Sequence, residues 1–158
     1  MATASDIAAR GDFIPFRGDL EDDEMPQRTL YLTKDCELWL RTVLVNVPQP
    51  PRRKLHPSDE VWSVFVDFIM GRPMAYNVHL KKLDPLGKHV WEFKPIGVRI
   101  FGYFYLKATF VAHHGEMKSK LIPNSKYDPH IDDVHTYINT IDLDPPPCIT
   151  QTGLAHVL

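Results

Sequence analysis

Residues 90–115 read VWEFKPIGVRIFGYFYLKATFVAHHG and carry the clearest strand pattern in the chain. It contains three runs that are rich in aromatic and β-branched residues, which favour strands. Two short connections separate the runs, Pro95-Ile96-Gly97 and Lys107-Ala108. Because connections this short join neighbouring antiparallel strands, the stretch predicts three consecutive antiparallel strands.

A helix is predicted upstream, over residues 56–71 (HPSDEVWSVFVDFIMG). Ser58 is a suitable N-cap and Gly71 a suitable helix end. Apolar residues recur at spacings of three and four, so one face of this helix should pack on the sheet. These apolar residues are Val61, Trp62, Phe65, Phe68 and Ile69.

The other expected elements lie on either side. Residues 28–33 alternate as a strand does, residues 34–47 favour a short helix, and residues 48–54 (PQPPRRK) form a proline-rich loop. Residues 128–141 carry apolar positions at helical spacing. Together these elements predict an α+β fold, with a small antiparallel sheet and helices packed on one of its faces.

The chain divides into three parts by composition. Residues 1–27 have seven acidic and two basic side chains, a net charge of −5, and are expected to be a disordered acidic arm. Residues 28–144 should form one domain, and residues 145–158, which begin with three prolines, a weakly ordered tail. Outside the arm the net charge is +3, which permits contact with nucleic acid.

Composition excludes several classes of protein. Hydrophobic residues make up 44% of the chain, which is enough for a packed core and argues against general disorder. Cys36 and Cys148 are far apart, so neither a disulfide framework nor a cysteine zinc site is indicated, and a reducing cytosol is expected. No segment has the roughly 18 apolar residues that a membrane span needs.

Three motifs in the β-rich part occur in a characteristic order: Val90-Trp91-Glu92-Phe93-Lys94, Val98-Arg99-Ile100-Phe101, and His114-Gly115 followed by lysines. With the order strand, helix, helix, three strands, helix, they resemble the HigB-like branch of the RelE/HigB toxin superfamily, which includes many prophage proteins. The match is close over residues 80–121 and looser over 28–142. Gly102 within the arginine strand and Glu116 in place of an aromatic depart from the family pattern.

The resemblance implies a RelE-like fold and a metal-independent endoribonuclease that cleaves ribosome-associated mRNA. The RNA's own 2′-hydroxyl would be the nucleophile, and no cofactor would be needed. Such a toxin is silenced by an antitoxin protein, so the implied partners are an antitoxin, mRNA and the ribosome. The cellular location would be the cytoplasm.

Three residues match the family's catalytic positions. Arg99 would clamp the scissile phosphate, Lys94 would neutralise it, and His114 would act as acid or base. His113, its neighbour, should face the other side of the strand. The structural alternatives are that Arg99 covers the sheet with its stem, Lys94 solubilises a strand end, and His114 is a hydrogen-bonded structural residue.

Four further residues are expected to bind RNA. Lys118 and Lys120 would hold phosphates, whereas Tyr103 and Tyr105 would stack on bases or, alternatively, belong to the core. The segment His130–His135 (HIDDVH) has a metal-binding composition. Its two histidines are five residues apart, however, so a surface helix face is favoured over a metal site.

Two other functions stay open at this stage. The first is a catalytically inactive RelE-fold module that binds another protein with its sheet or acidic arm. The acidic arm favours it, because an anionic segment can occupy a basic groove and mimic nucleic acid. The second is a structural component of a phage, which only the frequency of such domains in prophages supports.

Overall fold

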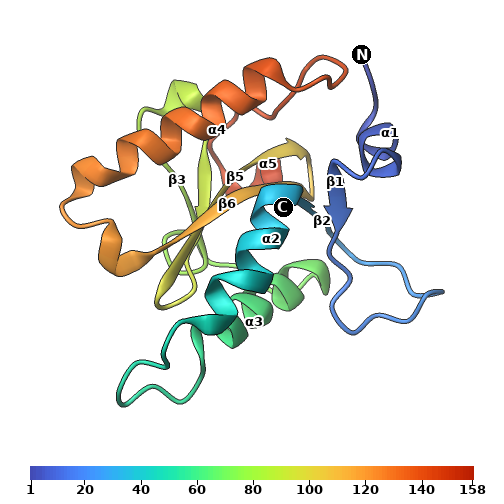
Figure 1. Cartoon of the computed structure of the whole chain (residues 1–158). Helices are drawn as coiled ribbons and strands as arrows, with labels where there is room; N and C mark the ends of the chain where they lie inside the picture. The colour runs from blue at the N-terminus through green and yellow to red at the C-terminus, as the bar shows by residue number, and fades with distance from the viewer.

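The computed structural model describes residues 1–158, and its centre is a six-stranded sheet (Figure 1). In spatial order the strands are β1 (Phe13–Pro15), β2 (Thr29–Thr33), β6 (Thr109–Met117), β5 (Val98–Leu106), β4 (Trp91–Phe93) and β3 (Leu80–Lys82). The helices are α1 (Ala4–Ala9), α2 (Lys34–Thr42), α3 (Pro57–Ile69), α4 (Asp128–Thr140) and α5 (Leu154–Val157). The chain is therefore α+β, as predicted, and no helix has both the length and the apolarity to cross a bilayer.

The three strands predicted from residues 90–115 are confirmed. β4 pairs antiparallel with β5, and β5 pairs antiparallel with β6. Gly102 lies at a β-bulge in the second pair, where an added Cβ would come within 2.0 Å of the Val111 carbonyl oxygen. Only glycine fits there, so the residue that departs from the family pattern has a local structural reason.

The sheet is mixed, which corrects the prediction of an antiparallel sheet. β2 runs parallel to β6, with Leu30 beside Phe110, and β1 extends the sheet antiparallel to β2. Leu30 and Leu32 alternate as expected and are buried in the core. The direction of β2 relative to β6 depends on the long chain between them, which includes α2 and α3, and local patterning does not encode it.

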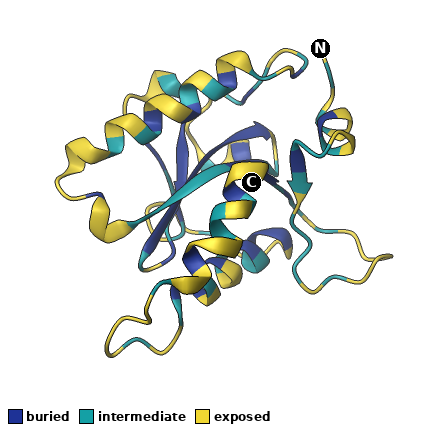
Figure 2. Cartoon of the chain, viewed as in Figure 1, coloured by how far each residue is buried: buried dark blue, intermediate teal, exposed yellow.

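Helices cover both faces of the sheet, not one face as predicted (Figure 1). α2 and α3 pack on one face, around a core that includes Phe65, Phe68 and Phe93. α4 packs on the other face, above Phe101 and Tyr103. All residues of β5 from Val98 to Tyr105 are buried, and Figure 2 shows the central strands dark blue between helices with exposed outer sides. A strand that is apolar on both faces needs cover on both.

The predicted helix after the proline-rich loop is confirmed as α3. Its N-cap is His56 rather than Ser58, because His56 Nδ1 accepts the Ser58 backbone N–H at 3.1 Å and Pro57 takes the first helical position. Gly71 adopts a φ of 72° directly after the helix, which agrees with its predicted role at the helix end.

The N-terminal segment is ordered, which corrects the expectation of a disordered arm over residues 1–27. Thr3 and Asp6 form a capping box that starts α1. Ile7 and Phe13 are each only 1% exposed, and Phe13 stacks on Tyr31 with ring centroids 5.3 Å apart. These two apolar residues bury enough surface to hold an otherwise polar segment against the sheet.

The C-terminal segment also packs on the domain instead of forming a weakly ordered tail. The backbone N–H of Ile149 donates to the Phe104 carbonyl, and the Val157 carbonyl accepts from Ala108. Val157 is fully buried in the core on the side of α2 and α3. Regular structure does end at the prolines, as predicted, but α5 resumes it after them.

Candidate functional site

A polar hollow of about 330 Å³ opens on the α4 face of the sheet. The strand register places three of its charged residues there, and Asp84 and Asp128 also line it. Lys81 on β3 lies opposite Glu92 on β4, and Arg99 at the start of β5 lies on the same face as Phe101, the β5 partner of Glu92. Tyr127, at the start of α4, closes the far side. Three strands and the beginning of a helix therefore contribute to one site.

Arg99 forms the floor of the hollow and is 6% exposed. Its Nη1 atom donates to the carbonyl oxygens of Pro95 at 2.7 Å and Val98 at 2.8 Å, and its Nε atom lies 3.7 Å from Glu92 Oε2. Its side chain is therefore enclosed by the fold, and main-chain carbonyls hold the guanidinium. The guanidinium is buried because the turn between β4 and β5 presents carbonyls that need a donor.

Glu92 is 3% exposed and is the buried partner of Arg99. Burial raises the pKa of the Glu92 carboxyl, whereas the charges of Arg99, Lys94 and Lys81 and the nearby Tyr127 hydroxyl oppose that rise. Glu92 Oε2 and Arg99 Nε are both buried without a hydrogen-bond partner. A bound hydroxyl, which donates to Glu92 and accepts from Arg99, would satisfy both atoms of this ion pair.

Lys94, at the end of β4, lines the same hollow. Its Nζ atom donates to the backbone oxygen of Asn77 at 3.0 Å and to the side-chain oxygen at 2.9 Å. Desolvation lowers the pKa of Lys94; Glu92 opposes this effect, and the charges of Arg99 and Lys81 add to it. Lys94 and Arg99, two of the three predicted catalytic residues, are therefore brought together.

His114 is the predicted catalytic residue that does not line the hollow. Its Nδ1 atom lies 2.7 Å from His113 Nδ1, and its Nε2 atom lies 2.9 Å from His130 Nδ1 on α4. Its ring stacks on Phe101, and burial lowers the pKa of His114 to about 3. The imidazole is neutral near pH 7 and has a structural place under α4, which is the alternative stated for it from the sequence.

His113 lies on the same side as His114, so the prediction that it faces away is wrong. The β-bulge explains this: Phe101 pairs with His114, but the next residue, Gly102, pairs with Ala112. His113 is the extra residue, and strict alternation fails at that point. Its ring packs on Tyr137 of α4, with centroids 4.6 Å apart.

The predicted RNA-binding tyrosines lie in the core, where they cannot stack on a base in this structure. Tyr103 is fully buried against Tyr137, and burial raises the pKa of the Tyr103 hydroxyl. Tyr105 is 9% exposed and belongs to the same cluster under α4. Both tyrosines therefore belong to the core, which is the alternative stated for them from the sequence. The reason is that the face of β5 that carries Arg99 continues beneath α4.

The predicted RNA-binding lysines lie outside the hollow, on the 3-10 turn η3 (Lys118–Lys120). Both are exposed, and the backbone N–H of Lys118 donates to the Gly97 carbonyl at 3.0 Å. Lys120 is 3.9 Å from Glu116, in a surface ion pair. Lys118 is thereby fixed to the turn that follows Lys94.

The segment His130–His135 contributes to packing and to the surface of α4. His130 stacks on Phe101 with centroids 5.0 Å apart. Asp132 forms an ion pair with Lys88, and His135 Nδ1 lies 3.3 Å from the Lys88 backbone oxygen. These contacts are those of a surface helix face, which the sequence favoured for this segment.

Sequence reasoning missed Glu92, Lys81 and Tyr127. A signal existed for Glu92, since a carboxylate between Trp91 and Phe93 in a buried strand needs a cationic partner, and Arg99 stands on the next strand. Tyr127 offered no such signal, because only the packing of α4 brings it to the sheet.

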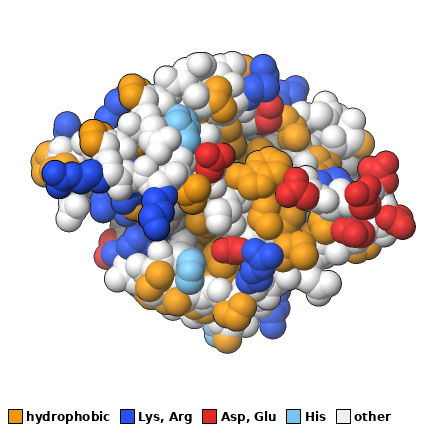
Figure 3. All heavy atoms as spheres, turned by 90° about the horizontal axis from the view of Figure 1, so that it is seen from below, with side chains coloured by type: hydrophobic (Ala, Val, Ile, Leu, Met, Phe, Trp, Pro, Cys, Tyr) orange, Lys and Arg blue, Asp and Glu red, His pale blue; other side chains and the backbone are white.

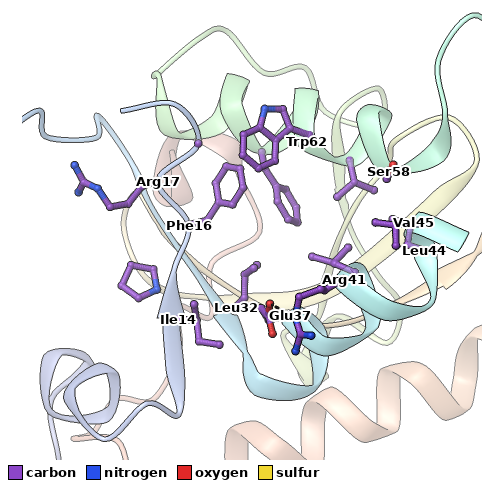
Figure 4. Close-up of a pocket in the computed structure, with 15 residues that line it drawn as sticks. Ile14, Phe16, Arg17, Leu32, Glu37, Arg41, Leu44, Val45, Ser58 and Trp62 are labelled. Carbon is purple, nitrogen blue, oxygen red and sulfur yellow. Dashed lines mark hydrogen bonds and ion pairs between the residues drawn. The ribbon is translucent and has the colours of Figure 1, made fainter. Parts of the chain in front are cut away.

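A second cavity, of about 390 Å³, lies on the opposite side of the sheet between β1, α2 and α3 (Figure 4). It is mainly apolar, with Phe16, Leu40 and Phe65 among its lining residues, and Trp62 at its side is 45% exposed. Arg41 and Glu37 pair at its rim with a separation of 2.9 Å. We call this cavity the apolar groove.

Comparisons with known protein families, curated proteins and solved structures find no significant match to this chain. The RelE/HigB resemblance therefore stays a prediction that rests on the residues quoted for it.

Proposed function

We propose that the chain is an endoribonuclease of the RelE/HigB type, that its active site is the polar hollow, and that it acts in a toxin-antitoxin system on ribosome-associated mRNA. One observation carries the proposal. Glu92 and Arg99 form a buried ion pair at a polar hollow, one atom of each lacks a hydrogen bond, and Lys81 and Lys94 line the same space together with Asp84 and Asp128. Perturbed titratable groups in a cavity are typical of catalytic sites.

The roles differ from those predicted for the sequence. Glu92, whose pKa is raised by burial, takes the proton of the RNA 2′-hydroxyl as general base. The 2′-oxygen then attacks the adjacent phosphorus, the bond from phosphorus to the 5′-oxygen breaks, and the products are a 2′,3′-cyclic phosphate and a 5′-hydroxyl. The guanidinium of Arg99 and the ammonium of Lys81 stabilise the charge on the phosphate.

Lys94 is the proposed general acid. Its lowered pKa eases donation of a proton to the leaving 5′-oxygen, and its hydrogen bonds to Asn77 hold the ammonium in place. His114 takes no part in this scheme, because its ring is neutral and engaged with His113 and His130.

The test is cleavage of a 5′-labelled RNA oligonucleotide, with and without chelator, by the purified chain. We expect a labelled product that ends in a 2′,3′-cyclic phosphate in both conditions. An oligonucleotide with a single 2′-deoxy residue at the cut position should resist cleavage there. Cleavage that persists at the 2′-deoxy position would contradict the use of the 2′-hydroxyl.

A second function, binding of another protein, is favoured by the apolar groove. The loop between β1 and β2 contributes Arg17 and Gly18 to its lining and carries Asp19, Glu21, Asp22, Asp23 and Glu24. The complementary occupant is a segment of a partner protein with an apolar anchor followed by Lys or Arg residues. An antitoxin with such a segment would make the two functions compatible.

Two synthetic peptides test this second function, with the same apolar anchor flanked by lysines in one and by glutamates in the other. Fluorescence anisotropy should show tighter binding of the lysine peptide, and Trp62→Ala should weaken that binding about tenfold. Leu55→Ala is the matched control, since Leu55 is 50% exposed and outside the groove. Equal binding of both peptides would rule out the acidic loop as a determinant.

A further inference from the structure

The proline-rich loop before α3 carries three consecutive cations, Arg52, Arg53 and Lys54. Arg52 and Lys54 are exposed, and Arg53 is half-buried. The loop borders two shallow cavities, of about 280 Å³ and 270 Å³, and the turn between β4 and β5 contributes Gly97 to the first and Ile96 to the second. The loop and that turn, which are distant in sequence, therefore form one surface.

Glu60 fixes the loop to the turn. Although it lies in the first turn of α3, Glu60 is 6% exposed. Its Oε2 atom accepts the Gly97 backbone N–H at 3.0 Å, and its Oε1 atom lies 3.3 Å from Arg53 Nη2. A buried carboxylate that holds both segments gives the basic loop a defined position.

The same turn also holds Lys118, whose backbone N–H donates to the Gly97 carbonyl. Residues Lys94 and Arg99 of the hollow flank the turn on both sides in sequence, and Arg99 donates to the Pro95 carbonyl. Cations from the loop, from η3 and from the hollow are thus all tied to residues 95–97.

These outer cations lack counter-ions. Arg52, Lys54 and Lys118 take part in none of the ion pairs of the structure, whereas the ion-paired acids lie elsewhere or are already engaged. Figure 3 shows Lys and Arg side chains gathered at one end of this face and Asp and Glu side chains at the other. Unpaired like charges held together favour a polyanion.

We propose that the RNA strand cut in the hollow continues across the turn at residues 95–97 and onto the loop at residues 50–54. Lys118, Arg52 and Lys54 hold the phosphates of the neighbouring nucleotides. This inference rests on the proposed function and extends it, since it gives the site a length of several nucleotides and a direction across the fold. Contacts of this kind bind without regard to base sequence.

The test measures affinity for non-cleavable 2′-O-methyl oligonucleotides of 4 and 12 nucleotides by fluorescence anisotropy at low salt. Lys54→Glu should weaken binding of the 12-mer about tenfold and leave the 4-mer within twofold of the unaltered protein. The salt dependence for the 12-mer should also become less steep. Lys107→Glu is the matched control, since Lys107 is an exposed lysine on the turn at the other end of β5 and should change neither affinity.

The outcomes separate the two proposals. If the unaltered protein cleaves RNA and Lys54→Glu binds the 12-mer normally, the extended track is wrong and the active site stands. If Lys54→Glu and Lys107→Glu weaken the 12-mer equally, the attraction is general and the track is also wrong. If the unaltered protein neither binds nor cleaves RNA, the proposed function fails together with the track.

Discussion

Arg99 joins the sheet to the turn before it, so its removal should weaken the fold as well as any activity. Arg99→Ala deletes two hydrogen bonds to buried carbonyls and leaves the Glu92 charge buried without its partner. Breaking a buried pair in this way costs about 3–5 kcal/mol. Urea denaturation should show a loss of this size. Arg41→Ala, which breaks an exposed pair with Glu37, should cost under about 1 kcal/mol.

If Arg99→Ala and Arg41→Ala prove equally stable, the guanidinium is not the anchor that its contacts suggest.

The histidines under α4 should make the fold sensitive to acid. The folded-state pKa of His114, about 3, lies below the ordinary value of 6.5, so between these values the unfolded chain binds the proton more readily. The contribution of His114 to stability is complete above pH 6.5 and falls as the pH drops, by roughly 2 kcal/mol at pH 5. His113 contacts the same ring, and burial lowers its pKa as well.

His114→Gln removes the titrating group and should flatten the pH dependence by that amount. Denaturation at pH 7 and at pH 5 measures it, with exposed His156→Gln as the control that leaves the difference unchanged. An unchanged pH dependence in His114→Gln would mean that the ring does not titrate under α4 as described.

At the residue scale, the sequence located part of the site. Lys94 and Arg99 were identified because both lie in motifs with a family pattern, and the fold places both at one hollow. His114 does not line the hollow, because one extra residue in β6 and the cover of α4, which are not local properties, decide where its ring lies. Glu92 was within the quoted motif, yet its role emerges only when the neighbouring strand supplies Arg99.

The elements α1 and β1 should contribute to the free energy of unfolding through their contacts with the sheet. Phe13→Ala removes a ring that is 1% exposed and stacked on Tyr31, and such truncations cost about 3–5 kcal/mol. Met25→Ala, at a side chain that is 79% exposed in the same segment, should have almost no effect. Thermal or urea denaturation compares the two. If the Phe13→Ala protein is as stable as the Met25→Ala protein, the N-terminal segment is not held against the sheet, and the expectation of a disordered arm stands.

The predictable elements are those whose signals are local. β5 and β6 have nine residues each, and α3 has thirteen residues with regular apolar spacing, so the pattern alone identified them. β1 and β3 have only three residues each, too few for a period to be visible. The parallel pairing of β2 with β6 and the docking of α5 depend on contacts between distant segments, which no local pattern encodes.

Although the whole molecule has a net charge of only −2, basic side chains gather at one end of one face and acidic side chains at the other. The acidic loop is held in place, since Arg17 Nη2 donates to the carbonyl oxygens of Glu21 and Glu24 at 2.7 Å. In Figure 1 this loop and the loop before α3 project at opposite sides of the molecule. The acidic loop and the basic loop are therefore separate surfaces, and each has its own partner chemistry.

In the proposed mechanism, Glu92 removes the proton from the RNA 2′-hydroxyl, so the rate of cleavage by Glu92→Gln is the decisive measurement. The substitution keeps the shape of the side chain and removes the base, so we predict cleavage at least about 100-fold slower than that of the unaltered protein. Near-UV circular dichroism and affinity for 2′-O-methyl RNA should confirm an intact fold and substrate site. Glu37→Gln, a change of the same kind outside the hollow, should cleave at the full rate. Equal cleavage rates for folded Glu92→Gln and Glu37→Gln would mean that Glu92 is not the base.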